Sequence, residues 1–280
     1  MKFLTQEEVA KLYSLIQLEP LKENQCRLQY IQTAAAKYQE HIPFQNVFLL
    51  STPVDQRRPL TFDEIKNLVL SGQGGFCQVM NVFFNSFLQT LGYESYILNS
   101  SYAKIPDNHV VIIVKNVLNQ GDSYLVDVGS GNFQYAIELN FEDKSPVYNF
   151  LYTKCYLQWD QDKKDIILFH INRNDESNHI YSFNLTPIKD FQSLSFQNHI
   201  YTNPKITPFH NILRILRFPQ SGAICIVDKT LLKENGQHRL KPEIGQFIND
   251  QEYLNTVKKY FGNLDLIQCQ IAYNSLFQNP

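Results

Sequence analysis

Three residues have the types and the order in the chain that could do chemistry: Cys77, His109 and Asp127. Cys77 follows Gly74 and Gly75 and precedes an apolar run with helical spacing, which predicts that it lies in the first turn of a helix. Unpaired backbone N–H groups and the helix dipole favour the thiolate there, and the thiolate is the nucleophilic form of cysteine. An inert, buried cysteine is the alternative interpretation.

The two other residues lie on one predicted hairpin. His109 opens the apolar segment HVVIIVKNV, and Asp127 closes the next segment, SYLVDVGS, with NQGD as the turn between them. If the hairpin pairs symmetrically about that turn, the partner of Asp127 falls between His109 and Ile113. One register therefore places imidazole and carboxylate side by side on the same face, whereas a slip of one residue separates them.

Together the three residue types indicate nucleophilic catalysis. A carboxylate beside an imidazole fixes the tautomer and favours the charged ring, and the charged ring holds a nearby cysteine as thiolate. Taken singly, His109 could be a polar residue at a strand end and Asp127 an acceptor next to a turn. The hypothesis depends on the fold bringing both to Cys77.

The elements that must position these residues fall into three parts. Residues 1–92 are predicted to be helical, with capping boxes at Thr5–Glu8 and Thr61–Glu64 as two helix starts and a third helix that stops at Gly92. The proline-punctuated segment 41–60 is expected to be an ordered connection without a helix. This part carries the candidate nucleophile.

The remaining two parts are richer in strands. Residues 93–200 contain short β-rich segments separated by Asn, Asp, Gly or Pro, which predicts a sheet or a small barrel that carries the histidine and the aspartate. Residues 201–280 are predicted to form an α/β unit, with a pair of strands within 215–227 and a final helix over 249–262. The fold class expected from this order is α+β.

Composition limits the partners. A net charge of -2, from 25 basic and 27 acidic residues, gives no field that would attract nucleic acid or an anionic membrane, so small molecules are expected. The first residues lack a signal sequence, and no apolar run has membrane-spanning length. The five cysteines are odd in number and lack metal-ligand spacing. We therefore expect a cytoplasmic protein with reduced thiols and no metal.

Four blocks of this sequence resemble the signature stretches of the arylamine N-acetyltransferases, in the same order. They are HIPFQN (41–46), GGFC (74–77) followed by Asn81, HVVIIV (109–114) and YLVDVGSG (124–131). The resemblance implies a papain-like cysteine transferase fold with an N-terminal helical bundle (1–92), a β-barrel domain (93–200) and a C-terminal α/β lid (201–280).

The resemblance also implies a ping-pong reaction with acetyl-CoA as co-substrate and no metal. The Cys77 thiolate would take the acetyl group from acetyl-CoA and pass it to the nitrogen of an arylamine, arylhydroxylamine or arylhydrazine, a chemistry that belongs to xenobiotic metabolism. His109 would manage the protons, with Asp127 as the third catalytic residue.

Further contacts follow from the same resemblance. Phe44 would line the acceptor pocket, and Ser130 would border it. Gly129 and Gly131 would let the pyrophosphate of CoA approach the backbone.

Two positions depart from the family pattern. Gln45 and Gln73 stand where the family usually has Glu and Arg, and we expect a hydrogen bond between the two glutamines to replace the ion pair.

Three alternatives stay open at this stage. An amide synthase of the same family would take its acyl group from a carrier protein. A cysteine hydrolase would use the same triad to transfer an acyl group to water. A binding protein could keep the fold without turnover. The natural acceptor amine, the preferred acyl chain and the oligomeric state are not fixed by the sequence.

Overall fold

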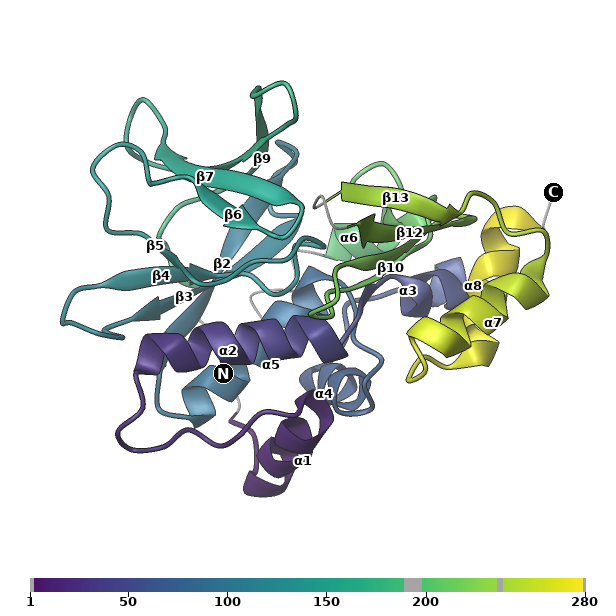
Figure 1. Cartoon of the computed structure of the whole chain (residues 1–280), viewed down its shortest axis with the longest axis horizontal. Helices are drawn as coiled ribbons and strands as arrows, with labels where there is room; N and C mark the ends of the chain where they lie inside the picture. The colour runs from purple at the N-terminus through teal and green to yellow at the C-terminus, as the bar shows by residue number, and fades with distance from the viewer. Residues whose placement is uncertain (1–2, 189–197, 236–238, 279–280) are drawn as a thin grey trace.

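The computed structural model describes residues 3–188, 198–235 and 239–278. Figure 1 shows the N-terminal helices at the bottom of the view, a curved sheet at upper left, and the C-terminal strands and helices at right. The mixture of helices and antiparallel sheets confirms the predicted α+β class. In the described ranges, no helix has both the length and the apolar character needed to cross a membrane.

The N-terminal part is helical, as predicted. Both capping boxes are present, at Thr5 with Glu8 and at Thr61 with Glu64, and they start the first and fourth helices. The elements are α1 (Gln6–Ile16), α2 (Arg27–His41), β1 (Phe44–Gln45), α3 (Val47–Ser51), a 3₁₀ turn (Val54–Gln56), α4 (Phe62–Leu70) and α5 (Cys77–Thr90).

The prediction of no helix in 41–60 was wrong, because α3 lies there. This helix has only five residues, and four of them are buried. A segment this short is marginal as an isolated helix, so tertiary packing must stabilise it. Val47 and Leu50 supply that packing, since they belong to the same hydrophobic cluster as the C-terminal helices.

The curved sheet has eight antiparallel strands in the order β5-β4-β3-β2-β9-β8-β7-β6. They are β2 (Glu94–Tyr102), β3 (His109–Lys115), β4 (Ser123–Val126), β5 (Ile137–Glu138), β6 (Tyr148–Phe150), β7 (Thr153–Trp159), β8 (Ile166–Ile171) and β9 (Ser177–Phe183). Helix α5 packs against β2 and β3. Every residue of α5 from Cys77 to Leu88 is buried, which explains why this helix is apolar on most of its surface.

The C-terminal part forms a five-stranded sheet in the order β1-β10-β11-β12-β13. Its elements are α6 (Asn198–Thr202), a 3₁₀ turn (Pro208–His210), β10 (Arg214–Arg217), β11 (Ile224–Val227), β12 (Thr230–Asn235), β13 (Arg239–Ile244), α7 (Asp250–Tyr260) and α8 (Leu266–Phe277). The predicted strand pair is β10 and β11. The helix expected to be the last is α7, but α8 follows it, so that prediction was wrong.

The five-stranded sheet separates two hydrophobic cores. Ile215 and Ile226 face one way, into the cluster that contains α7 and α8. Leu216 and Cys225, which pair across the same two strands, face the other way, into the main core of the protein. Because side chains along β10 point alternately to the two faces of the sheet, every second one faces the main core.

Candidate active site

Cys77 is the first residue of α5 and is 3% exposed. Phe76 before it has an extended backbone and provides no side-chain cap, so the first N–H groups of α5 have no side-chain acceptor from the N-cap residue. Gly74 makes the approach possible, because it has φ +66° and a Cβ there would lie 2.0 Å from the carbonyl oxygen of Pro43. The predicted place of Cys77 at a helix start is confirmed.

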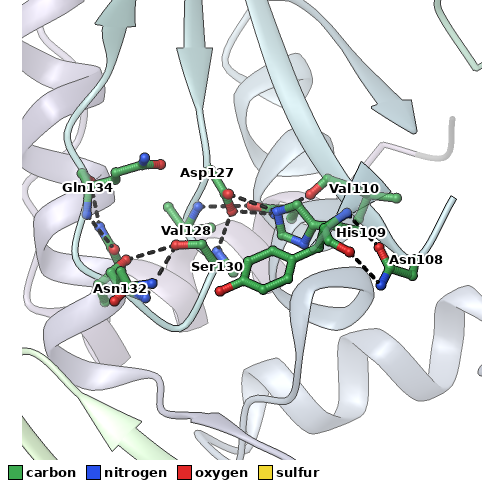
Figure 2. A network of polar contacts seen from close by, with 12 residues as sticks. Asn108, His109, Val110, Asp127, Val128, Ser130, Asn132 and Gln134 are labelled. Carbon is green, nitrogen blue, oxygen red and sulfur yellow. Dashed lines mark hydrogen bonds and ion pairs between the residues drawn. The ribbon is translucent and has the colours of Figure 1, made fainter. Parts of the chain in front are cut away.

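The structure brings His109 and Asp127 together. Nε2 of His109 donates a hydrogen bond of 2.8 Å to Oδ2 of Asp127, and both residues are buried (Figure 2). The hairpin register pairs Ile112 with Val126, so its continuation sets Asp127 opposite Val111. The direct pairing allowed by the sequence is therefore not the one observed. Instead the two side chains meet across the diagonal of the same sheet face.

The carboxylate of Asp127 is held by further donors. Its Oδ1 accepts hydrogen bonds from the side-chain amide of Asn81 at 2.8 Å and from the backbone N–H of Gly129 at 3.0 Å. The side-chain oxygen of Asn81 accepts from the backbone N–H of Val128 at 2.9 Å. A buried charge needs such donors, and Asn81 supplies one from the helix that carries Cys77.

The loop after β4 is fixed by polar contacts along its length (Figure 2). The hydroxyl of Ser130 donates to the carbonyl of Asn132 at 3.0 Å and accepts from its N–H at 3.2 Å. Farther along, the side chain of Gln39 on α2 bonds both the N–H and the carbonyl of Gln134. The loop that follows Asp127 is thus attached to α2 as well as to α5.

The ring of His109 interacts with Cys77 as well as with Asp127. The sulfur of Cys77 is a hydrogen-bond partner of the ring, and because Nε2 is committed to Asp127, Nδ1 is the nitrogen left for the sulfur. Burial alone would lower the pKa of His109, but the charges of Asp127 and Cys77 outweigh burial and raise the pKa to about 10. The ring is therefore an imidazolium at neutral pH.

Cys77 and His109 line a cavity of about 60 Å³. Three aromatic rings form its walls, those of Phe44, Tyr102 and Phe209. A nucleophilic thiol with a proton-carrying ring beside it, in an aromatic pocket, can take an acyl group and pass it to a second substrate.

Of the four predicted contact residues, three line the cavity and one does not. Phe44, Gly129 and Ser130 line the cavity with Cys77. Gly131 is not among the lining residues. Its Cα instead faces the ring of Phe44, where a Cβ would lie 3.5 Å from the ring.

The two glutamines do interact, but not as predicted. The side-chain amide of Gln45 donates to the main-chain carbonyls of Gln73 at 3.3 Å and Gly74 at 3.2 Å. Its oxygen accepts from the N–H of Phe48 at 3.3 Å. The partner is therefore the backbone before Cys77 and not the side-chain amide of Gln73, because Gln45 is buried directly beside that backbone.

Sequence reasoning missed Asn46 and Arg214. Asn46 is fully buried, and its amide donates to the carbonyls of Phe209 at 2.7 Å and Ile212 at 2.6 Å. Its side-chain oxygen accepts from the N–H of Arg214 at 2.8 Å, and Arg214 lines the cavity. Asn46 and Arg214 are 168 residues apart in the chain, so only the β1–β10 pairing brings them together.

The start of α5, the curved sheet and the C-terminal sheet line this cavity together, an arrangement that suits an acyltransferase. The profile of the N-acetyltransferase family matches residues 27–269, which is most of the chain. The protein therefore belongs to the arylamine N-acetyltransferase family. A search of curated proteins finds no match.

Solved structures agree on the fold. The arylamine N-acetyltransferase from Salmonella typhimurium has a TM-score of 0.80 at 15% identity, with 98% of this chain and 100% of that chain covered. The Mycobacterium marinum arylamine N-acetyltransferase in complex with CoA has a TM-score of 0.79 at 17% identity, covering 96% and 100%. Arylamine N-acetyltransferase C from Bacillus anthracis has a TM-score of 0.76 at 18% identity, covering 93% and 100%.

Proposed function

We propose that this protein transfers an acetyl group from acetyl-CoA to the nitrogen of an arylamine, arylhydroxylamine or arylhydrazine. The observation that carries the proposal is the position of His109, whose ring has Asp127 on one nitrogen and Cys77 as its other partner. Family membership supports the acyltransferase class. Cys77 is the nucleophile, His109 the proton carrier and Asp127 the residue that orients and charges the ring.

In the first half-reaction, the Cys77 thiolate attacks the carbonyl carbon of the acetyl thioester. The tetrahedral intermediate then collapses, the bond from carbon to the CoA sulfur breaks, and the proton of His109 neutralises the departing thiolate. CoA leaves as the thiol, and the acetyl group stays on Cys77 as a new thioester. His109 is then neutral and can act as a base.

In the second half-reaction, the nitrogen of the acceptor attacks the acetyl-Cys77 carbonyl. Neutral His109 takes the proton that the nitrogen loses, and the sulfur of Cys77 leaves as thiolate. The products are the N-acetylated acceptor and the enzyme in its starting thiolate–imidazolium state. Asp127 keeps its charge throughout and fixes the orientation of the ring.

For the other predicted contact residues we propose the roles that the family resemblance implies. Phe44 packs against the acceptor ring and Ser130 borders it, which their place in the cavity supports. For Gly129 and Gly131 we propose that they let the pyrophosphate of CoA approach the backbone. The CoA complex of the M. marinum structure supports a CoA thioester as donor.

Location and organisation are also proposals. We propose that the enzyme works in the cytoplasm on small molecules, without nucleic acid or membrane partners. We further propose that it is built from the domains 1–92, 93–200 and 201–280, with β1 and α3 of the first domain packed on the third.

The test is intact-protein mass spectrometry after mixing with acetyl-CoA. We expect a mass gain of one acetyl group on Cys77, lost when an arylamine or arylhydrazine is added, and no gain in the Cys77→Ala variant. Release without any amine would indicate a hydrolase. No gain from acetyl-CoA, with acylation from a carrier-bound thioester, would indicate an amide synthase and would overturn the proposal.

A further inference from the structure

A second buried histidine lies directly behind the wall of the cavity. His210 ends the 3₁₀ turn Pro208–His210 and is 8% exposed. Pro208 and Phe209, the two residues before it, line the cavity together with Cys77. His210 itself takes no part in the proposed acyl transfer. A buried imidazole needs a hydrogen-bond partner for each of its two nitrogens, and these partners show what it does in the fold.

The two partners of the ring fix its protonation state. Nη1 of Arg57 donates to Nδ1 of His210 at 2.8 Å, because a guanidinium can only donate. Nε2 of His210 donates to the carbonyl of Ile200 at 2.8 Å, because a carbonyl can only accept. One ring nitrogen must therefore carry a proton and the other must lack one. His210 is the neutral Nε2–H tautomer, whereas His109 is an imidazolium.

The surroundings of His210 disfavour a second proton. Burial lowers its pKa below the ordinary value of 6.5, the hydrogen bond to Ile200 opposes this shift, and the charge of Arg57 adds to it. Helix α3, which packs against the turn, has no titratable side chain. The titratable side chains of the other segments around the ring are Asp55, Arg57, His199 and Tyr201. Of these, Arg57 supplies the charge that acts on the ring.

Arg57 is held in place by a second hydrogen bond. Its Nε donates to the carbonyl of Thr52, the residue after α3, at 3.1 Å. Within the described part of the chain, Arg57 belongs to none of the ion pairs. Protonation of His210 would turn Nδ1 into a donor facing a donor and would set two positive charges side by side. The contact between Arg57 and His210 therefore exists only while His210 is neutral.

Phe209 connects the first segment that His210 holds to the nucleophile. Its ring stacks on that of Phe76, with centroids 5.5 Å apart and planes inclined by 18°. Phe76 is the N-cap residue of α5, directly before Cys77, and is fully buried. Because His210 follows Phe209 in the chain, the two hydrogen bonds of its ring limit the movement of this wall.

The second segment reaches the nucleophile from the other side. Ile200 lies on α6, and the next residue, Tyr201, donates from its hydroxyl to Oε1 of Gln78. Tyr201 and Gln78 are each 1% exposed, and Gln78 follows Cys77 in the first turn of α5. The hydrogen bond from His210 to Ile200 therefore joins the two segments that contact the residues before and after the nucleophile.

We propose that neutral His210, held by Arg57, is a positioning residue for acyl transfer, and that its protonation in acid loosens both the cavity wall and the start of α5. The inference rests on the proposed function and adds to it a second histidine, outside the triad, that limits activity in acid. A displacement near 1 Å at a reacting group is enough to cost rate, so a small movement of Cys77 away from His109 has a measurable effect.

The first test compares two substitutions of His210. His210→Gln keeps an amide N–H that can donate to the carbonyl of Ile200 and cannot titrate, whereas His210→Ala loses both ring hydrogen bonds. At pH 7.5 we expect acetylation of Cys77 to slow by about 10- to 100-fold in His210→Ala and by no more than about threefold in His210→Gln. Rates are taken per acetylatable Cys77, so a loss of folded protein does not enter. Equal losses in the two variants would overturn the proposal.

The pH dependence separates positioning from a merely structural role. The acetylation rate of the wild type divided by that of His210→Gln should fall by about 3- to 10-fold between pH 7.5 and pH 5, the effect of one hydrogen bond. The fall should lie below pH 6.5, where His210 begins to take up a proton. Titration of Cys77 and His109 is common to both proteins and cancels in this ratio. A constant ratio would overturn the proposal.

The matched control is His170→Gln on β8. Burial lowers the pKa of His170 to about 4, so this residue stays neutral over the same range. The ratio of wild type to His170→Gln should therefore be constant from pH 7.5 to pH 5.

A further measurement does not depend on acetyl transfer. Alkylation of Cys77 by iodoacetamide requires the thiolate, which forms only while Cys77 lies beside His109, so its wild-type to His210→Gln ratio should also fall in acid. If no acetyl-enzyme forms but this ratio falls, the proposed function fails and the role of His210 stands. If acetyl-enzyme forms and both ratios are constant, the role of His210 alone fails.

Discussion

Asn81 donates a hydrogen bond of 2.8 Å to Asp127 and so connects α5 to the loop after β4. Cys77 lies one helical turn before Asn81 on the same helix. The helix that presents the nucleophile therefore also fixes the carboxylate that orients His109. Because Asn81 accepts from the N–H of Val128 as well, the loop cannot turn away without breaking both bonds.

The first prediction concerns Asn81. Asn81→Ala removes one donor from the buried carboxylate of Asp127 and the side-chain donor to the carbonyl of Val110, so we expect a loss of about 1–3 kcal/mol in the free energy of unfolding. Urea unfolding measures it. Acetylation of Cys77 should slow as well, because the position of Asp127 is no longer fixed. Asn149→Ala, exposed on β6, is the control and should change neither quantity.

The second prediction concerns the charge of Asp127. Asp127→Asn keeps the size of the side chain but removes the charge that keeps His109 protonated. We expect a cooperative thermal transition, with acetyl transfer reduced roughly 10³- to 10⁴-fold as in other triads that lose this charge. Stopped-flow acetylation and iodoacetamide alkylation of Cys77 should slow together. Unchanged alkylation would contradict the role given to Asp127.

The parts of the fold that were predictable are those encoded locally. The capping boxes at Thr5 and Thr61 and the helix start at Cys77 depend on residues within four positions of each other, and all three were found. Helix α3 could not be found in this way, because its packing partners lie in the C-terminal core. Helix α8 has apolar residues around most of its circumference, which hides the periodicity that would have marked it.

The candidate site also has one part that is encoded locally and one part that depends on contacts distant in the sequence. His109 and Asp127 share a hairpin, so their proximity followed from one turn, although the diagonal contact needed the true register. The pairing of Phe44 with Leu216 brings Asn46 to Arg214. No local sequence pattern predicts a contact between residues so far apart in the chain. The catalytic residues could thus be predicted from sequence, while Arg214, which lines the same cavity, could not.

The third prediction is a pH dependence of stability. The folded pKa of His109 is about 10, above its ordinary value of 6.5, so the folded state binds the proton more tightly. This contribution to stability is complete below pH 6.5 and is lost as the pH rises toward 10. Cys77→Ala removes the contribution of the Cys77 sulfur to this raised pKa, so the upper end of the window should fall below pH 10.

The measurement compares Cys77→Ala with Cys77→Ala/Asp127→Asn by urea unfolding between pH 6 and pH 10. The single variant should lose stability across this range, and the double variant should lose less, because without the charge of Asp127 burial keeps the pKa of His109 low. Parallel curves for the two proteins would show that Asp127 does not raise the pKa of His109.

The fourth prediction concerns Asn46. Asn46→Ala removes two donors and one acceptor from the backbone at Phe209, Ile212 and Arg214. We expect a loss of about 1–3 kcal/mol in the free energy of unfolding and a raised KM for the acceptor, because Phe209 and Arg214 line the cavity. Acetylation of Cys77 should fall less than the second half-reaction. Equal losses in the two half-reactions would argue against a role confined to the acceptor side.

The last prediction concerns Gly129. A Cβ at this position would lie 2.8 Å from the Cα of Cys77, and backbone atoms cannot give way as a flexible side chain can. Gly129→Ala must therefore move either the loop or the start of α5, and a displacement near 1 Å at a reacting group can cost about 10²-fold in rate. We expect acetylation of Cys77 to fall by about that factor. The control is Gly245→Ala, where a Cβ meets nothing within 4 Å and the rate should not change. A fully active Gly129→Ala enzyme would show that the close contact between this loop and the helix start does not set the position of the nucleophile.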